Sequence, residues 1–364
     1  MSGSQIPPDT VSLLDYERRF HERVDPAIRA YLAGAAADGI TQRENCAAFE
    51  RLRLMPRAMV DMSRASARST LLGESLDYPI LIAPTASHKL VHPDGEIATV
   101  QAASLTRTWM TVSTQASVTL EEVARASTTP LWFQLYFQPR DEETLTLVRR
   151  AEQADYKAIV VTIDAVVSGV RNREQRAGFR LPDGVRPVNL AGFPPHAPVT
   201  ARYGSPVFQG MLDRCPTWAD IESLCKRTSL PVLVKGLLNP LDVGPALQSG
   251  VAGIIVSNHG GRVLDTVPAT IDVLPAIATA VAGAVPVLLD GGVRRGTDIV
   301  KAMASGAAAV LIGQPVLHAL AVGGMPGVAH MLTLLQTELE VAMALMGRPS
   351  LKDIDPTALL VSRP

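Results

Sequence analysis

A histidine and an arginine at the end of an apolar run are the residues of this chain best suited to chemistry. Residues 256–262 read Val-Ser-Asn-His-Gly-Gly-Arg and continue the apolar run 253–256. His259 can exchange a proton near neutral pH, whereas Arg262 stays charged and can hold a carboxylate through two parallel hydrogen bonds. A strand that ends in a base and an anion-binding group predicts a site for an acidic substrate. A glycine turn with a hydrogen-bonded histidine and a solvated arginine is the alternative for this segment alone.

Two glycine-containing segments further along the chain indicate a phosphate site. Residues 290–296 read Asp-Gly-Gly-Val-Arg-Arg-Gly, and residues 312–315 read Ile-Gly-Gln-Pro. Each follows an apolar run, and the amides of a glycine loop beside a helix N-terminus commonly bind phosphate. An ordinary tight turn is the alternative for Asp-Gly-Gly. The place of both segments at the end of a strand–helix series favours a phosphorylated ligand.

Eight short apolar or β-branched runs must position these residues. Helical patterns such as 120–126, 142–153 and 298–304 lie between them, an alternation typical of parallel strands joined by helices. The runs span residues 80–83, 110–113, 131–136, 158–162, 232–235, 253–256, 287–290 and 309–312. An α/β TIM (β/α)8 barrel is predicted in preference to a doubly wound sheet, because eight units suit a barrel. The C-terminal ends of barrel strands meet on one face, so the polar residues there are expected to form one site.

Ahead of the first strand, residues 1–75 are expected to form a helical segment. Patterns typical of capping boxes begin at Ser12 and at Thr41, each with an acidic residue three positions later. Asp25 precedes a proline, and this pair suits the start of a helix because proline fits the first helical position. These signals predict about three helices before the barrel.

Two longer segments complete the single barrel domain that is expected over residues 1–364. Residues 165–216 follow the fourth strand and contain seven prolines, and they far exceed the usual connection of about 4–6 residues. This loop is expected to be an active-site lid or to be partly disordered. Residues 328–346 predict a long amphipathic helix that ends at Gly347.

Composition limits the classes of partner. The 34 basic and 35 acidic residues give a net charge of −1, so neither nucleic acid nor an anionic membrane is an expected partner. The three widely spaced cysteines fit neither a disulfide framework nor a metal site, and they suit a reducing compartment. The chain starts without a secretion signal, and no run approaches the ~18 apolar residues of a membrane span, which predicts a soluble cytoplasmic protein.

Taken together, the motifs resemble those of the FMN-dependent 2-hydroxy acid oxidases and dehydrogenases, a family that includes glycolate oxidase, lactate oxidase and mandelate dehydrogenase. The resemblance runs from about residue 15 to residue 351, and the combination of its motifs is highly specific. They are residues 83–86 (Ala-Pro-Thr-Ala), 92–96 (His-Pro-Asp-Gly-Glu), 133–136 (Phe-Gln-Leu-Tyr), 234–236 (Val-Lys-Gly), 256–262 and 289–296.

The resemblance implies that FMN binds at the strand ends. The implied cofactor-binding residues are Pro84, Thr85, Ala86, Ser113, Gln134, Thr162, Lys235, Ser257, Asp290, Gly291, Gly292, Val293, Arg294, Gly313 and Gln314. Gln134, Thr162 and Ser257 offer uncharged donors and acceptors for the edge of a flavin. Lys235 offers a cation for the anionic reduced ring, although a lysine inside a barrel also suits a Schiff base.

For the substrate, the resemblance implies a carboxylate site and a base. The implied residues are Tyr31, Arg171 and Arg262 around the carboxylate, Tyr136 near the hydroxyl, His259 as the base and Asp164 beside it. A carboxylate next to the base would stabilise the imidazolium that forms when the 2-hydroxyl loses its proton. Hydride transfer and abstraction of the Cα proton use the same residues, so both mechanisms stay open. Taken singly, the two tyrosines also suit packing.

Two positions depart from the family pattern. Gln115 stands where glycolate-oxidising members have a tryptophan over the substrate side chain, which predicts a substrate larger than glycolate. Gln314 replaces an arginine that usually helps to bind the phosphate, which predicts weaker FMN binding. Arg294 and the glycine amides remain there, and Arg295 is the nearest residue that could replace the missing charge.

The resemblance predicts oxidation of an (S)-2-hydroxy acid to the 2-keto acid, with oxygen as the favoured acceptor and hydrogen peroxide as its product. Ala86 resembles the oxidases, because mandelate dehydrogenases commonly have a glycine at that position. A dehydrogenase for mandelate or another 2-hydroxy acid, with a quinone or other acceptor, is the alternative within this class. The resemblance also implies a homo-oligomer, specifically a tetramer.

Two other classes of function stay open on the sequence. One is a non-redox isomerase or aldolase that binds a substrate phosphate at 290–296 and forms a Schiff base on Lys235. The other is a flavin-binding protein without turnover. Bound FMN in the purified protein would exclude the non-redox isomerase or aldolase. Reduction of that flavin by 2-hydroxy acids would exclude a flavin-binding protein without turnover.

Overall fold

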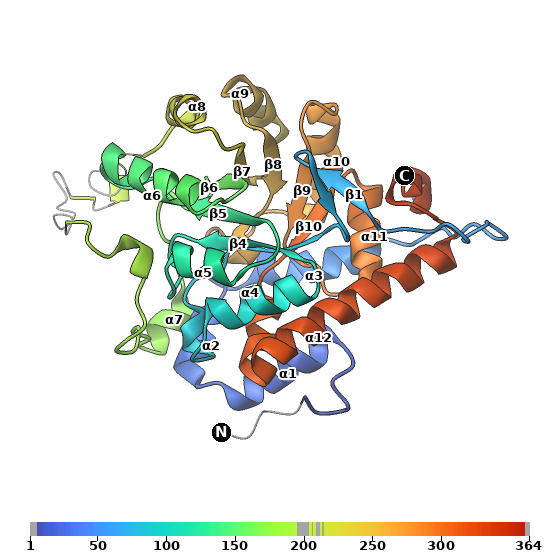
Figure 1. Ribbon diagram of the computed structural model, residues 1–364, viewed down its shortest axis with the longest axis horizontal. Coiled ribbons are helices and arrows are strands. Elements are labelled where there is room, and N and C mark those ends of the chain that lie inside the picture. The colour runs from blue at the N-terminus through green and yellow to red at the C-terminus, as the bar shows by residue number, and fades with distance from the viewer. Residues whose placement is uncertain (1–5, 195–203, 206, 209–211, 213–214, 361–364) are drawn as a thin grey trace.

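In the part of the chain that the structure describes, eight parallel strands close into a barrel because the last strand pairs with the first. The computed structural model describes residues 6–194, 204–205, 207–208, 212 and 215–360 (Figure 1). The barrel strands are β3 (Ile80–Ile82), β4 (Trp109–Ser113), β5 (Leu131–Leu135), β6 (Ala158–Thr162), β7 (Val232–Leu237), β8 (Gly253–Val256), β9 (Val287–Asp290) and β10 (Ala309–Ile312). Val310 of β10 lies in register with Ile80 of β3. The predicted barrel is confirmed, and a doubly wound sheet is excluded.

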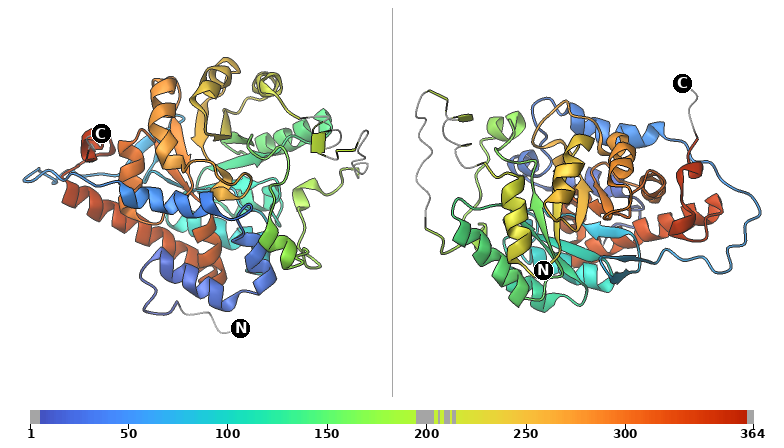
Figure 2. Two further views of the ribbon diagram at one scale, coloured as in Figure 1. Left: turned by 180° about the vertical axis from the view of Figure 1, so that it is seen from behind. Right: turned by 90° about the horizontal axis from the view of Figure 1, so that it is seen from above.

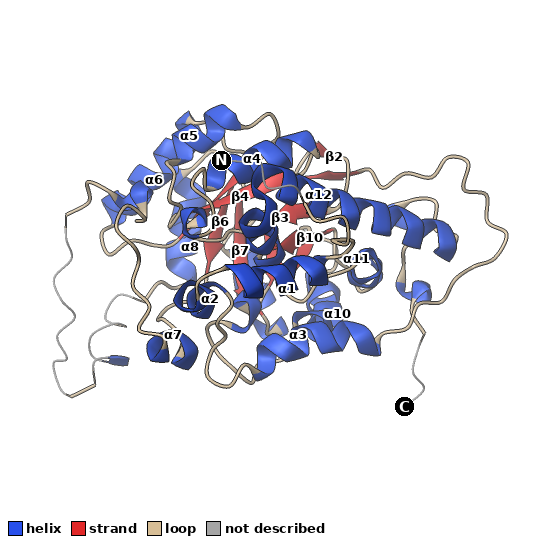
Figure 3. Ribbon diagram, turned by 90° about the horizontal axis from the view of Figure 1, so that it is seen from below, coloured by secondary structure: helices blue, strands red, loops and turns tan. Residues whose placement is uncertain are grey.

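Inward-facing apolar side chains fill the barrel. Leu233, Ile255 and Leu288, from three neighbouring strands, are fully buried in one cluster at its centre. Helices cover the outer face (Figure 3), so the strands are buried on both faces, and such strands read as continuous apolar runs. Successive side chains of a strand point to opposite faces, so the next inward-facing positions along these strands lie at the C-terminal end of the barrel.

Helices connect the strands and surround the barrel. They are α4 (Glu96–Leu105), α5 (Leu120–Ala126), α6 (Asp141–Gln153), α8 (Trp218–Arg227), α9 (Val243–Gln248), α10 (Thr270–Val281) and α11 (Gly296–Ala304). The helices expected at 120–126, 142–153 and 298–304 are therefore confirmed as α5, α6 and α11. In α5, Thr119 and Glu122 form a capping box, which explains why this helix begins where the sequence indicates.

An antiparallel hairpin replaces the end of the expected N-terminal helical segment. It consists of β1 (Ser69–Leu71) and β2 (Glu74–Leu76), joined by residues 72–73. Both turn residues have positive φ, of 52° and 85°, as a two-residue hairpin turn with the right twist requires. Leu71 and Leu76 join the apolar cluster inside the barrel. The hairpin therefore closes the end of the barrel opposite the strand tips.

Within residues 6–68, three helices precede this hairpin: α1 (Leu13–Arg23), α2 (Pro26–Leu32) and α3 (Ile40–Arg51). The predicted starts at Ser12 and Asp25 are confirmed, because the Ser12 side chain accepts one backbone N–H group of α1 and the Asp25 side chain accepts two of α2. The capping box at Ser12 is only half formed, because Asp15 accepts the N–H of Val11 rather than that of Ser12. The capping box predicted at Thr41 is wrong.

Helix α3 begins one residue before Thr41 and is capped by a distant residue. The Asp265 carboxylate accepts the N–H of Thr41 at 2.8 Å and that of Asp38 at 3.0 Å, while Gly39 at the N-cap has no side chain to do so. The Thr41 hydroxyl is already used, because it donates to the carbonyl of Val267. The cap of this helix thus comes from the loop after β8 and not from its own sequence.

The C-terminal helix is longer than predicted. Helix α12 (Gln314–Met346) starts directly after β10, is interrupted at Gly324, where φ is 56° and ψ is −144°, and ends at Gly347 as expected. By length and composition it could cross a membrane, contrary to the expectation that no segment approaches this limit. However, 72% of its most apolar stretch is buried, and it packs against α1, α4 and α11. This burial is typical of a core helix.

The long loop after β6 crosses the C-terminal face of the barrel. It contains α7 (Asn172–Arg176), and its backbone bonds to other parts of that face, from Ala37 N to Val170 O and from Val188 N to Ala116 O. Residues 195–203, 206, 209–211 and 213–214 lie outside the described residues, so the expectation of a lid or of partial disorder stays a prediction there.

We predict that Asp265→Ala lowers the free energy of unfolding by about 1–2 kcal/mol, because loss of a helix cap typically has this cost. Burial would raise the pKa of Asp265, but its bonds to backbone N–H groups outweigh this and keep it below 3.8. The stabilisation should therefore be complete well above pH 3.8 and shrink as the pH falls through the lowered pKa. Urea unfolding of wild type and Asp265→Ala across this range measures it. Asp265→Asn keeps one acceptor oxygen, so its free energy of unfolding should fall by less than that of Asp265→Ala. An equal fall in both variants would contradict the role of Asp265 as a helix cap.

Candidate cofactor and substrate site

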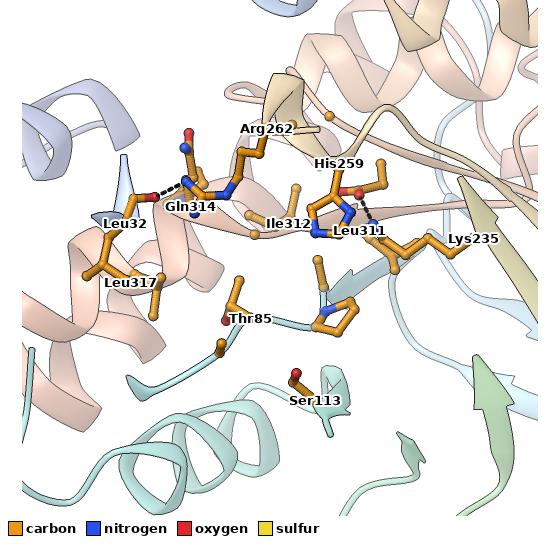
Figure 4. A pocket seen from close by; sticks show the side chains of 18 of the residues that line it. Leu32, Thr85, Ser113, Lys235, His259, Arg262, Leu311, Ile312, Gln314 and Leu317 are labelled. Carbon is orange, nitrogen blue, oxygen red and sulfur yellow. Dashed lines mark hydrogen bonds and ion pairs between the residues drawn. The ribbon is translucent and has the colours of Figure 1, made fainter. Parts of the chain in front are cut away.

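A cavity opens at the C-terminal end of the barrel, and the predicted site residues surround it (Figure 4). Its volume is about 1210 Å³, including the part that is open to solvent. The predicted residues that line it are Tyr31, Pro84, Thr85, Ala86, Ser113, Gln115, Gln134, Tyr136, Thr162, Arg171, Lys235, His259, Arg262, Asp290, Gly291, Gly292, Val293, Arg294, Gly313 and Gln314. Asp164 and Ser257, the two others, lie directly behind the wall and contact His259 and Lys235.

The convergence of these side chains follows from strand geometry. Lys235 lies two residues after the inward-facing Leu233, and Asp290 lies two residues after Leu288. Because the side-chain period of a strand is two, each occupies the next inward position. The same spacing brings Ser113, Gln134, Thr162 and Ser257 to the cavity or just behind it.

Lys235 is the buried cation at the base of this cavity. Its Nζ lies 2.7 Å from Oδ2 of Asp290 and donates to the Ser257 hydroxyl at 3.0 Å. That hydroxyl donates to Asp290 at 2.7 Å and accepts the backbone N–H of His259 at 3.1 Å. Burial alone would lower the pKa of Lys235, but the carboxylates of Asp290 and Asp164 outweigh it and raise the pKa above 10.5. The side chain is therefore a permanent ammonium.

His259 is held as a base by Asp164. The two side chains meet at 2.9 Å between Nδ1 and Oδ1, and because His259 lines the cavity, Nε2 is the ring nitrogen available to a ligand. His259 has φ of 57°, an uncommon conformation for a residue other than glycine, and one that functional sites often contain. Gly260 and Gly261 continue it at 63° and 74°, so this turn needs the two glycines that follow the histidine.

Gly236 allows Asp164 to approach the histidine. It has φ of 119° at an irregularity in the pairing of β7 with β8. A Cβ atom on Gly236 would lie 2.6 Å from both Cβ and Cγ of Asp164, a separation at which one of them must move. The Lys-Gly pair was part of the family motif, but the sequence alone did not show what the glycine is for.

Arg262 and Arg171 form an electropositive corner of the cavity. The Arg262 side chain is partly buried, and its guanidinium donates to the carbonyls of Tyr31, Leu32 and Gly34 at 2.8, 3.0 and 2.6 Å. Burial, with the repulsion of Arg171, lowers its pKa to about 10, so it remains charged at neutral pH. These carbonyls orient the guanidinium but leave its positive charge uncompensated. An anion bound in the cavity would neutralise that charge.

Two tyrosines complete this corner. The Tyr31 ring lies 5.9 Å from the Arg262 guanidinium and stacks on Phe179 at 4.4 Å between ring centroids. Burial raises the pKa of Tyr136, so its hydroxyl keeps its proton and can donate. Arg171 pairs with Glu174 at 3.2 Å, yet its Nε is buried and has no partner among the described residues. The corner therefore has donor capacity left for a carboxylate.

The opposite wall fits FMN. Nε2 of Gln134 is buried without a hydrogen-bond partner in the described structure, as is Nε2 of Gln314 at the other end of the cavity. Gly291 and Gly292 have φ of 110° and 84°, and a Cβ on Gly292 would lie 2.1 Å from the carbonyl oxygen of Asn45. Amide donors for a flavin edge and glycine amides near a cation for a phosphate are the groups that FMN requires.

The phosphate end has one arginine rather than two. Arg294 lines the cavity and donates to the carbonyl of Val293 at 3.0 Å. Gln314 lacks the positive charge of the family's arginine, and Arg295 was the residue expected to replace that charge. This expectation is wrong. Its guanidinium pairs with Glu338 at 2.8 Å and does not line the cavity.

Several lining residues come from helices outside the barrel and were not predicted. Gln42, Asn45 and Cys46 of α3 reach the cavity, as does Leu317 of α12. Asn45 exchanges two hydrogen bonds with Asn258, at 2.9 and 2.7 Å, which fixes α3 beside the tip of β8. No local motif marks these positions, because their role depends on the packing of α3 against the barrel.

Known proteins resemble this chain over nearly its whole length. It is 45% identical over 353 residues to an L-lactate oxidase of Alicycliphilus denitrificans, which covers 97% of each protein. It is 42% identical over 351 residues to glycolate oxidase 3 of Arabidopsis thaliana, covering 96% of this chain and 95% of that enzyme. A crystal structure of mandelate oxidase with benzoyl-formic acid superposes with a TM-score of 0.88 at 38% identity, covering 97% of this chain and 98% of the other.

The family itself is identified by a sequence model. The model of the FMN-dependent dehydrogenases matches residues 20–361, a range that includes the whole barrel and each of the predicted site residues. The relatives, the closed barrel and the geometry of the cavity agree with it. This chain belongs to the FMN-dependent dehydrogenase family.

Proposed function

We propose that this protein oxidises (S)-2-hydroxy acids to 2-keto acids with bound FMN. One observation carries the proposal: the base pair of His259 and Asp164 and the unneutralised guanidinium of Arg262 face one cavity whose opposite wall fits FMN. Bound along that wall, FMN would supply the redox chemistry, namely the uptake of two electrons from the substrate and their later transfer to an acceptor.

The carboxylate of the substrate binds in the corner of Arg262, Arg171 and Tyr31. Arg262 is oriented by three backbone carbonyls, so little conformational entropy is lost when a carboxylate binds. Arg171 offers its unpartnered Nε. Fixing the carboxylate fixes the position of Cα, and such positioning is a large part of catalysis.

His259 takes the proton of the 2-hydroxyl group. Its Nε2 faces the cavity, and the imidazolium that forms is stabilised by Asp164 at 2.9 Å. Tyr136 keeps its proton and donates to the substrate oxygen. A proton taken from Cα instead would use the same imidazole and the same carboxylate.

Lys235 argues against the non-redox alternative. A Schiff base requires a neutral amine, but the carboxylates around Lys235 raise its pKa and keep it protonated. Its fixed charge at the base of the cavity instead suits the anionic reduced flavin. A barrel isomerase or aldolase is therefore the weaker interpretation.

The proposal also covers the electron acceptor, the oligomeric state and the cellular location. Oxygen as the acceptor is supported by the relatives, which are named oxidases. A homo-oligomer is supported by the arm 52–68, which projects from the molecule (Figure 2) and exposes Met55 and Met59 to solvent. A reducing, cytoplasmic location is supported by Cys46, Cys215 and Cys225, which are free thiols.

The test of the function is reduction of the flavin by substrate. The purified protein should show the two-band visible spectrum of bound FMN, and (S)-2-hydroxy acids should bleach it under anaerobic conditions. Readmission of air should restore the spectrum and release hydrogen peroxide. A protein that FMN cannot reconstitute, or a flavin that no 2-hydroxy acid in a broad panel reduces, would exclude the proposal.

We predict that this enzyme prefers 2-hydroxy acids larger than glycolate. Gln115 lines the cavity with an exposed side chain, so the space beside the substrate is open. The ranking of kcat/KM across glycolate, lactate and mandelate should place glycolate last. Gln115→Trp should shift the ranking toward small substrates, and a wild-type ranking with glycolate first would contradict this assignment.

We predict that His259→Ala retains FMN and slows flavin reduction by roughly two to four orders of magnitude, the usual contribution of a positioned base. Anaerobic stopped-flow at saturating substrate measures the rate, and the visible spectrum reports FMN content. Reduction within tenfold of wild type would remove His259 from the role of base.

We also predict that Gly236→Ala slows flavin reduction by about 10²-fold, the cost of a catalytic group displaced by about 1 Å. The new Cβ would push Asp164 away from His259. Gly244→Ala is the matched control, because its Cβ would meet nothing within 4 Å. If Gly236→Ala folds, binds FMN and keeps the wild-type rate and pH profile, the position of Asp164 does not depend on this glycine.

A further inference from the structure

A second hollow adjoins the phosphate end of the cofactor cavity. It lies between helices α1, α2 and α3 and the loop after β9, and its volume is about 1650 Å³, including the part that is open to solvent. The residues that line both hollows are Gln42, Cys46, Gly292, Arg294 and Gln314. The two hollows therefore meet where the sequence and the glycine loop place the phosphate of FMN.

The second hollow carries uncompensated positive charge. Arg29, Arg43 and Arg173 line it, and none of them has a carboxylate oxygen within 4.0 Å among the described residues. Nε of Arg29 is buried and has no hydrogen-bond partner in this part of the chain, and its Nη1 donates only to the backbone carbonyl of His21. A buried donor without an acceptor costs free energy, so this guanidinium is suited to an anion that supplies one.

The acidic residues of the hollow do not cancel this charge. Asp298 already accepts the backbone N–H groups of Arg294 and Arg295, each at 3.0 Å, and lies 3.8 Å from the Lys301 ammonium. Glu17 and Glu50 are the two other carboxylates in the lining. Three unpaired arginines and Arg294 thus outnumber the carboxylates that remain.

Gln314 lowers the positive charge at the inner phosphate position, so this position suits a phosphate with less negative charge. A phosphomonoester such as that of FMN carries a charge of about −1.5 to −2 at neutral pH, whereas a phosphate esterified on both sides carries one negative charge. Among the described residues of the shared wall, only Arg294 supplies a full positive charge, because Gln314 is neutral and Arg295 pairs with Glu338. The charge distribution, with Arg294 at the inner position and three unpaired arginines outside it, suits two linked or neighbouring phosphates.

We propose that this second hollow binds a phosphate group next to that of the flavin cofactor. The group can belong to the adenylate half of FAD, which would extend the flavin into the hollow, or to a free phosphate-bearing anion that binds beside FMN. The proposal rests on the position of the FMN phosphate in the proposed function, and it adds a binding site to it.

The first experiment titrates apoprotein with FMN and with FAD and follows the quenching of flavin fluorescence. If FAD fills the hollow, its Kd should lie within about tenfold of that of FMN. Arg29→Ala should weaken FAD by about tenfold or more and FMN by less than threefold, because a hydrogen bond to a charged group is worth ~1.5–3 kcal/mol and 1.4 kcal/mol is one decade. Arg125→Ala, a surface arginine that lines neither hollow, is the matched control and should change neither.

The second experiment titrates the FMN-loaded protein with pyrophosphate and with ADP by calorimetry. If the ligand is a free anion, at least one should bind, and Arg29→Ala should weaken it by about tenfold or more. Gln314→Arg tests the inner position, because the added charge should tighten FMN by about tenfold.

The proposal is overturned if FAD binds more than about 100-fold more weakly than FMN and neither pyrophosphate nor ADP binds the loaded protein. It is also overturned if Arg29→Ala leaves every observed affinity unchanged. In both cases FMN binding and anaerobic bleaching by 2-hydroxy acids would remain, so a failure of this site is distinguishable from a failure of the proposed function.

Discussion

The buried ion pair between Lys235 and Asp290 is the constraint on which the rest of the site depends. It connects the ends of β7 and β9 across β8, and the Ser257 hydroxyl between them bonds to both. Two charges in a protein interior cost several kcal/mol of desolvation, and removal of one partner typically destabilises by ~3–5 kcal/mol. Here every member has a partner, and the same serine accepts the N–H of His259. The alignment of three strand ends and the conformation of the catalytic turn are therefore fixed by one network.

Most of the barrel could be predicted from the sequence, because its signals are local. Parallel strands buried on both faces read as apolar runs, and Ser12 and Asp25 lie next to the helices that they cap. The capping box at Thr41 failed because a residue 224 positions away, Asp265, supplies the cap. The hairpin was missed because its three-residue strands are stabilised by contact with the barrel interior and not by their own pattern.

The residues of the site also divide into those that local sequence signals predict and those that depend on distant contacts. Side chains at strand ends, such as Gln134 and Lys235, could be predicted because the topology alone brings them together. The roles of Gly236 and Cys46 could not be predicted, because each depends on a neighbour that is distant in sequence. That neighbour is Asp164 for Gly236 and the loop after β9 for Cys46. Arg295 shows the opposite error, since proximity in sequence suggested a role that its pairing with Glu338 excludes.

The hairpin of residues 69–76 has a kinetic consequence. Leu71 and Leu76 close one end of the barrel with apolar side chains that are at most 3% exposed, so in the described structure the cavity is reached from the opposite face. Hydroxy acid, keto acid and electron acceptor then all enter and leave on the face that carries the strand ends. The keto acid leaves and the acceptor arrives on this same face, so the order of these two events, and not the chemistry alone, sets how turnover responds to acceptor concentration.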